Sequence, residues 1–202
     1  MLSWRIAAQI RSALFAGQIA PGDFLGTEAS LAREFGVSRM VSRDALRGLE
    51  ATGIVEIRQG AKGGVRVAPG NLDRSADALA IQLKLAGVTD AEVLDARIAL
   101  ESVSAELAAQ RATADDRREL RRLLDESAAL VGDADAFAAS AVRFHLAIAE
   151  ASRNRAIIAQ LRALHHVLEP VHARHATPDT FSLDDAHQVA EVIRPLNEPA
   201  AA

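Results

Sequence analysis

Two short helical patterns lie on either side of a glycine in SLAREFGVSRMVSRDALRGLEATG, residues 30–53. Thr27, just before this stretch, and Ser38 within it are typical of residues that cap the start of a helix. Gly36, between the two patterns, can take the left-handed backbone conformation that a tight turn needs. The second pattern runs from Ser38 to about Ala51. The spacing therefore predicts two helices joined by a short turn, a helix-turn-helix.

Three arginines, Arg39, Arg43 and Arg47, recur every four residues and share one face of the second helix. In a helix-turn-helix the second helix enters the DNA major groove, where an arginine fork can bind O6 and N7 of guanine together. The alternative is a solvated face on which the arginines pair with Asp44 and Glu50. The turn and the cap, together with a hairpin predicted next along the chain, favour DNA binding.

Patterns on both sides of this motif extend the prediction to the whole chain. Apolar residues at helical spacing predict a helix before the motif. After it, IVEIR and VRVA flank the glycine-rich QGAKGG, which predicts a β-hairpin, or wing. We expect a linker at residues 69–75. Further helices are expected at about 75–86, 90–111, 113–131, 133–151, 154–176 and 183–194. Several of them are preceded by residues typical of helix caps, namely Thr89, Thr113, Asp133 and Thr180.

The expected fold class is mostly α, with two domains. Residues 1–70 form a winged helix-turn-helix of three helices and a β-hairpin, and residues 71–202 form an all-α helical bundle. Half of the 202 residues are apolar and only 3% are aromatic. A core of mostly aliphatic side chains fits helices better than a β-sandwich.

Charge is distributed unevenly between these two parts. Residues 1–70 hold nine Lys or Arg and six Asp or Glu, whereas residues 71–202 hold fourteen and twenty-one. A basic front part fits a module that binds a polyanion. The chain has no cysteine, so a disulfide framework is impossible. We see no signal-peptide pattern and no apolar run of membrane-spanning length, and we expect a cytoplasmic protein with no membrane partner.

The front part resembles the winged helix of GntR-type bacterial transcription regulators, over about 60 residues. The resemblance implies that Ser38, Arg39 and Arg43 contact DNA, and that Gln59 and Gly60 lie at the wing tip near the minor groove. We add Lys62 to this set because of its charge. The matching elements are Glu28-x-x-Leu31-Ala32, Gly36-Val37-Ser38-Arg39, Arg43-x-Ala45-Leu46 and the Gly60 to Gly64 wing.

Three residues depart from the pattern of this family. Gly26 and Met40 stand where prolines are common, and Ala29 stands where some members place an arginine that contacts DNA. These departures concern the DNA sequence that is bound rather than DNA binding itself.

The rear part, residues 75–194, resembles the all-helical ligand-binding domain called FCD, through LDARIALESVSAELAAQRAT and RFHLAIAEASRNRAII. Domains of this kind often hold a divalent metal, with a small carboxylate bound nearby. The usual ligands are an Asp four residues before a His and two later histidines. Here His145 and His187 match, and Ala141 stands at the Asp position, while the last His would follow the end of this sequence.

A divalent metal such as zinc on His145 and His187 is therefore a possible cofactor implied by the resemblance. His165, Glu169 and His172 share a helix face and could supply substitute ligands. The alternative is that the histidines are hydrogen-bonded core residues.

Arg97 is the candidate ligand-binding residue. As a cation in a cavity it would take the carboxylate of an effector as a bidentate partner. An ordinary salt bridge to Glu101, four residues later, is the alternative.

These features together predict a ligand-responsive transcription regulator, a repressor that binds a short palindromic operator as a homodimer. A small carboxylate effector would bind the helical domain and change operator affinity. One alternative is a constitutive DNA binder with a degenerate sensor that lacks its last helix. A metal-dependent hydrolytic enzyme with a DNA-binding head is a further alternative, but the sequence has no His-Glu-x-x-His, Gly-x-Ser-x-Gly or phosphate-loop motif.

Overall fold

A computed structural model of the chain describes residues 2–60, 63–130 and 132–175. The chain divides into two compact units, Met1–Asn71 and Leu72–Ala202. The predicted helix at 183–194 lies outside the described residues. None of the described helices is long and apolar enough to cross a membrane.

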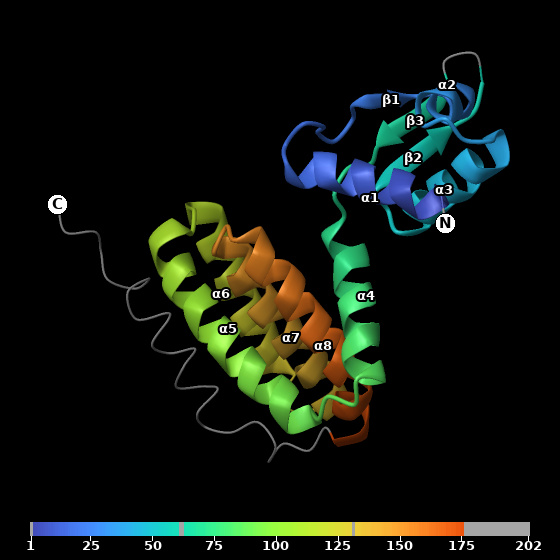
Figure 1. Cartoon of the computed structure of the whole chain (residues 1–202). Coiled ribbons are helices and arrows are strands. Elements are labelled where there is room, and N and C mark those ends of the chain that lie inside the picture. Colours follow the sequence, from blue (N-terminus) through green and yellow to red (C-terminus); the bar gives the residue numbers. More distant parts are fainter. Residues whose placement is uncertain (1, 61–62, 131, 176–202) are drawn as a thin grey trace. The chain divides into compact units, whose positions relative to one another are not determined.

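The front unit is a winged helix-turn-helix (Figure 1). Its strands form one antiparallel sheet in the order β1-β3-β2, and both helices of the predicted motif are present. In chain order the elements are α1 (Leu2–Phe15), β1 (Phe24–Gly26), α2 (Glu28–Glu34), α3 (Arg39–Ala51), β2 (Val55–Arg58) and β3 (Gly64–Val67).

The first strand, β1, was not predicted from the sequence, which indicated only the β2–β3 hairpin. β1 has three residues and pairs with β3, so that Phe24 lies opposite Arg66 and Gly26 opposite Val65. Such a short strand depends on a partner about 40 residues away and leaves no periodic pattern of its own. The Arg66 guanidinium lies 5.0 Å from the centre of the Phe24 ring, which adds a cation–π contact to the pairing.

Both predicted helix caps of the motif are confirmed. The Thr27 hydroxyl accepts a hydrogen bond from Ser30 N at 3.1 Å, and the Ser30 hydroxyl accepts one from Thr27 N at 2.8 Å, a reciprocal capping box. The Ser38 hydroxyl accepts from Val41 N at 3.3 Å. Gly36 has φ 63°, so the turn between the helices uses the left-handed conformation that glycine favours.

The core of the front unit fixes the orientation of α3. Leu46 and Leu49 of α3 are almost fully buried against Ile6 of α1 and against Val55 and Val65 of the sheet. Because one face of α3 is held in this core, the opposite face, which carries the arginines, is directed to solvent.

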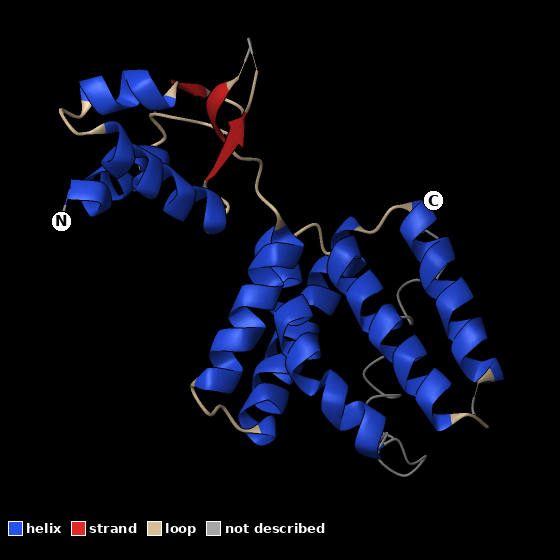
Figure 2. Cartoon of the chain, turned by 90° about the vertical axis from the view of Figure 1, so that its right-hand side faces the viewer, coloured by secondary structure: helices blue, strands red, loops and turns tan. Residues whose placement is uncertain are grey.

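The rear unit is a bundle of five described helices (Figure 2). They are α4 (Leu72–Leu85), α5 (Asp90–Arg111), α6 (Ala114–Ala129), α7 (Ala134–Ala151) and α8 (Arg155–His175). Thr89, Thr113 and Asp133 cap α5, α6 and α7, as the sequence indicated. The predicted linker at 69–75 is wrong in its second half, since α4 begins at Leu72.

The early start of α4 has a physical cause. Leu72 packs against the α7–α8 cluster that contains Leu161. Asp73 lies in the first turn, where an acid is favourable next to the helix dipole. Its carboxylate also pairs with Arg162 of α8, whose other terminal nitrogen lies 2.6 Å from Glu150 of α7. These contacts stabilise the helical conformation in residues that look like linker from sequence alone.

We expect Leu46→Ala to lower the free energy of unfolding of the front unit by about 2–5 kcal/mol, because it leaves a cavity in the centre of that core. Met40→Ala on the same helix is the matched control, since Met40 is 74% exposed and its truncation should change stability by less than about 0.5 kcal/mol. Calorimetric unfolding measures both. Equal effects of the two substitutions would contradict the packing of α3 described here.

Candidate nucleic-acid interface and buried polar cluster

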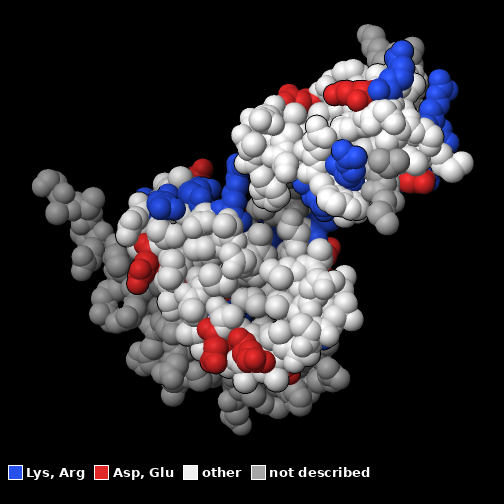
Figure 3. Space-filling view, in the orientation of Figure 1, with Lys and Arg blue, Asp and Glu red and all other residues white. Residues whose placement is uncertain are grey.

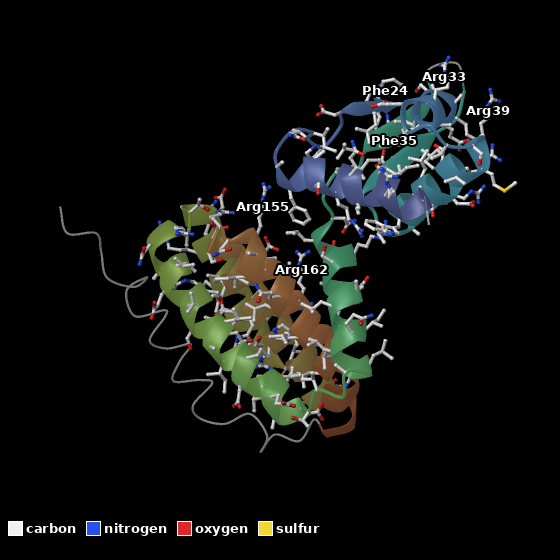
Figure 4. All side chains as sticks on the ribbon, in the orientation of Figure 1. Phe24, Arg33, Phe35, Arg39, Arg155 and Arg162 are labelled. Atoms are coloured by element: carbon white, nitrogen blue, oxygen red, sulfur yellow. The ribbon has the colours of Figure 1, made fainter. Side chains whose placement is uncertain are left out.

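The solvent face of α3 carries the residues predicted to contact DNA. Arg39 is the first residue of the helix, directly after the Ser38 cap, and Arg43 and Arg47 follow at one-turn intervals; all four are exposed. The Arg39 side chain points away from the core in Figure 4. The N-terminus of α3 also presents backbone N–H groups, which favour a phosphate.

Arg43 is not fully free on this face. Its Nε donates a hydrogen bond to Glu28 Oε2 of α2 at 3.2 Å, and the Arg43 side chain remains 57% exposed. The expected alternative, pairing with Asp44 and Glu50, is not the one observed for Arg43. The Glu50 carboxylate instead accepts from Ile57 N at 3.1 Å.

The wing begins at Gln59 and Gly60, both exposed. Gly60 has φ 104° and its carbonyl accepts from Gly63 N at 2.8 Å, which closes the turn. A Cβ atom at Gly63 would lie 2.4 Å from Arg58 O, so this position needs glycine. Lys62 lies outside the described residues.

Gly26, which stands where the family often has proline, has φ 130°. Proline is restricted to φ near −65°, so it cannot adopt this backbone. A Cβ atom at Gly26 would also lie 2.7 Å from the Ser30 hydroxyl that completes the α2 capping box. The departure from the family pattern is thus built into the local structure.

Figure 3 shows where the charged side chains lie on one face of each unit. On the face drawn there, arginines project from the edge of the front unit where α2 and α3 lie. Arg33 of α2 and Arg39 of α3 both point outward at this edge (Figure 4). These two arginines therefore lie at one edge of the front unit, where Figure 3 also shows acidic side chains.

The rear unit contains a polar cluster buried between three helices. Arg97 and Glu101 come from α5, His145 from α7 and His165 from α8, and each side chain is at most 12% exposed. Arg97 Nε lies 2.8 Å from Glu101 Oε1. His145 Nδ1 lies 3.4 Å from Glu101 Oε2, and His165 Nε2 lies 3.4 Å from Glu101 Oε1.

The Glu101 carboxylate is the centre of this cluster. Burial raises its pKa, but the imidazoles of His165 and His145 and the Arg97 guanidinium together outweigh burial and hold the pKa below its ordinary value. Glu101 is therefore ionised at neutral pH and balances the charge of Arg97.

Several polar atoms of the cluster lack a well-directed hydrogen bond. Arg97 Nε, Glu101 Oε1 and both ring nitrogens of His165 are buried without a hydrogen-bond partner among the described residues. The close Arg97–Glu101 approach is thus an ion pair with poor hydrogen-bond geometry. Buried polar atoms of this kind are uncommon in folded proteins.

The described residues do not assemble the expected metal site. Ala141, at the Asp position, is buried on α7 and contributes only a methyl group. No group of three His, Asp or Glu residues suited to a metal ion occurs within residues 2–60, 63–130 and 132–175. His187 and the side chains of Glu169 and His172 are not described.

Two contacts of these sites were not predicted from the sequence. Glu28 was noted only as part of a family motif, and its partner Arg43 is fifteen residues away, beyond any helical periodicity. The sequence offered His165 as a substitute metal ligand or a core histidine but did not indicate its partner, and the structure places it beside Glu101. Its position in an apolar stretch of α8 was the only available signal.

Two family models match the chain. The model of bacterial regulatory proteins of the gntR family matches residues 2–67, and the model of the FCD domain matches residues 92–198. Streptococcus agalactiae GntR has a similar fold, with a TM-score of 0.50 at 22% identity over 96% of this chain and 97% of that one.

Curated relatives agree with these matches. A protein of Escherichia coli (strain K12) named for regulation of the L-lactate dehydrogenase operon is 33% identical over 93% of this chain and 75% of its own length. The HTH-type transcriptional regulator Rv0494 of Mycobacterium tuberculosis is 32% identical over 98% and 82%, respectively. The Uxu operon transcriptional regulator of Escherichia coli (strain K12) is 35% identical over 78% and 61%.

These families and relatives are transcription regulators and not enzymes, which excludes the hydrolytic alternative. The chain belongs to the GntR family of bacterial regulatory proteins, with a helical domain of the FCD type, and is a DNA-binding transcription regulator.

Proposed function

We propose that the protein is a dimeric repressor that acts in the cytoplasm and whose operator affinity is changed by a small carboxylate metabolite. The observation that carries the proposal is that the chain has two features at once. The front unit has an exposed arginine face on α3, and the helical unit has a buried polar cluster in which several atoms lack a hydrogen bond. The first suits DNA and the second suits a small polar ligand.

Ser38, Arg39 and Arg43 would contact the operator from the N-terminal half of α3. Arg39 and Arg43 lie one turn apart and can reach adjacent positions in the major groove. Gln59, Gly60 and Lys62 would contact the minor groove from the wing. The exposed position of the described members of this set supports the assignment.

Dimer formation is expected because one recognition helix reads too few bases to select a site. The rear unit exposes large apolar side chains on two helices that are consecutive in the chain, including Ile81 and Leu85 of α4 and Leu94 and Ile98 of α5. Coverage of such side chains by a second copy would bring two front units to the two half-sites of a palindrome.

The effector would bind at the buried cluster, with its carboxylate on Arg97. Arg97 is already paired with Glu101, so a carboxylate that took the Arg97 fork would leave Glu101 Oε1 without that donor. A hydroxyl group on the same molecule could donate to Glu101 Oε1 and accept from a ring N–H of His165, whose nitrogens have no hydrogen-bond partner among the described residues. The site therefore fits a hydroxy carboxylate. L-Lactate, which appears in the name of one relative, has this chemistry.

Transmission to the DNA-binding unit would pass through α8. His165 of α8 lies in the cluster. On the same helix, Arg162 and His166 pair with Asp73 and Asp77 of α4, respectively. α4 directly follows the short segment 68–71, which connects it to β3 of the front unit. A ligand that moves α8 can change the placement of α4, provided that it binds one arrangement more tightly than the other.

A divalent metal remains a prediction, with His145 and His187 as its ligands. The described residues offer no complete set of donors, so no part of the proposed response depends on a metal. Metal analysis of the purified protein before and after chelation tests it separately.

The Arg97–Glu101 pair also favours one alternative, a constitutive regulator with a degenerate sensor. In that case the ion pair is purely structural and Arg97 never exchanges its partner. The two candidates predict different responses to hydroxy carboxylates.

For the DNA contacts, we expect selection from a random-duplex library at fixed salt to enrich a short palindrome with the wild-type protein. Arg43→Ala should lose about 1–3 kcal/mol of discrimination at one base pair of each half-site, because its guanidinium no longer binds that base. Arg118→Ala, on the exposed face of α6, is the control. Equal binding of all sequences by both the wild type and Arg43→Ala would contradict the assignment.

For the effector, we expect L-lactate or a related hydroxy carboxylate to change the operator affinity of the wild type. Arg97→Lys keeps the charge but loses the fork, and should weaken the response about tenfold. The double variant Arg97→Gln, Glu101→Gln removes both charges without leaving either one unpaired, and should abolish the response while DNA binding persists. Titration of fluorescent operator with ligand measures this. If neither L-lactate nor related hydroxy carboxylates change the operator affinity of the wild type, the constitutive alternative is favoured.

A further inference from the structure

Glu28 connects the two helices of the DNA-binding motif through both its side chain and its main chain. Its carboxylate accepts a hydrogen bond from Arg43 Nε at 3.2 Å, and its carbonyl accepts one from the buried Ser42 hydroxyl at 3.3 Å. Ser42 and Arg43 are neighbours on α3, so the first residue of α2 holds one point of the recognition helix by two bonds.

The atom of Arg43 that Glu28 binds determines what the arginine can still do. A guanidinium has five N–H donors in a planar fork, and only the Nε–H is engaged by Glu28. Arg43 has no other hydrogen bond or ion pair in the described part of the chain. The two terminal nitrogens therefore stay available side by side, which is the edge that reaches O6 and N7 of guanine together.

The same bond restricts the orientation of the guanidinium plane. An exposed arginine loses rotamer freedom when it is fixed on a base. With Nε held on Glu28, part of that ordering is complete before DNA arrives. Preorganisation of this kind increases affinity for the matching base without adding a contact.

The charge of Glu28 has a second effect. The carboxylate lies at the N-terminal end of α2, and the first helix of this motif crosses the DNA backbone. A negative charge there repels phosphates at every sequence and weakens non-specific binding. It also partly neutralises Arg43, so Arg43 gains less from a phosphate than from a guanine edge that its fork matches.

We propose that Glu28 is a specificity-determining positioning residue, which orients Arg43 for bidentate guanine recognition and lowers binding to non-specific DNA. The proposal rests on the role of Arg43 in base recognition. The pair has little weight in stability, because Arg43 and Glu28 are 57% and 34% exposed and exposed ion pairs contribute little. If the pair were purely structural, its removal would leave DNA specificity unchanged and would change the melting temperature only slightly.

The test compares Glu28→Ala with Glu28→Gln. The alanine variant removes the hydrogen bond and the charge, whereas the glutamine variant keeps an oxygen that can accept from Arg43 Nε and removes only the charge. We expect Glu28→Ala to lose at least about threefold of the preference for guanine at the base pair that Arg43 reads, with preferences elsewhere unchanged. Glu28→Gln should retain that preference within about twofold. Both variants should bind a scrambled duplex about two- to fivefold more tightly at low salt.

Glu34→Gln is the matched control, since it removes an equal charge from the exposed C-terminal end of α2. It should leave the preference at the Arg43 base pair unchanged. Dissociation constants for the selected operator, for its single-base variants and for the scrambled duplex give all these values, with melting curves to confirm folding.

The outcomes separate this inference from the proposed DNA contacts. If Arg43→Ala changes no base preference, the assignment of Arg43 itself fails. If Arg43→Ala loses its preference while Glu28→Ala retains it in full, the positioning role of Glu28 is wrong. Loss of the preference in Glu28→Gln as well as in Glu28→Ala would show that the charge, and not the orientation, determines recognition.

Discussion

The helical unit is organised around a buried carboxylate that has to remain charged. Glu101 lies among aliphatic side chains, where an isolated carboxylate would cost several kcal/mol or more. Arg97 balances its charge from the next turn of α5, and His145 and His165 bring hydrogen-bonding capacity from α7 and α8. Three helices are thus held in register by one group. An aliphatic core alone would permit many arrangements of these helices, whereas the need to surround Glu101 selects among them.

α8 links this constraint to the rest of the chain. Its buried side contributes His165 to the cluster. Arg162, three residues earlier, and His166, the next residue, contact acids of α4. The arrangement follows from helical spacing. Arg162 and His166 are four residues apart and share a face, whereas His165 lies about 100° around the helix from His166. One rigid helix can therefore be part of the proposed ligand site and of the connection to α4 at the same time. A shift of α8 by even a fraction of a turn would change both sets of contacts.

Local signals predicted most of the fold, and contacts between distant segments explain what they missed. Helix starts at Thr27, Ser38 and Thr89 could be read directly, since a cap is made by a side chain and a backbone N–H within three residues. The pairing of β1 with β3 could not, because a three-residue strand has no period. The Arg97–Glu101 spacing indicated an ion pair, but its burial depends on α7 and α8 and could not be read from α5 alone. For the same reason the sequence indicated Arg43 but not its partner on α2.

The two arginine–glutamate pairs of this protein differ in solvent exposure, and this difference suits them to different tasks. Arg43–Glu28 is exposed and engages only Arg43 Nε, so the terminal nitrogens of the arginine can bind DNA while the pair stays in place. Arg97–Glu101 is buried, and separation of its charges without a replacement would cost about 3–5 kcal/mol. A ligand at the buried pair must therefore supply both an acceptor for Arg97 and a donor for Glu101. In the proposed function, an anion without a donor group would therefore suit the exposed pair but not the buried one, which would keep DNA recognition and effector binding apart within one chain.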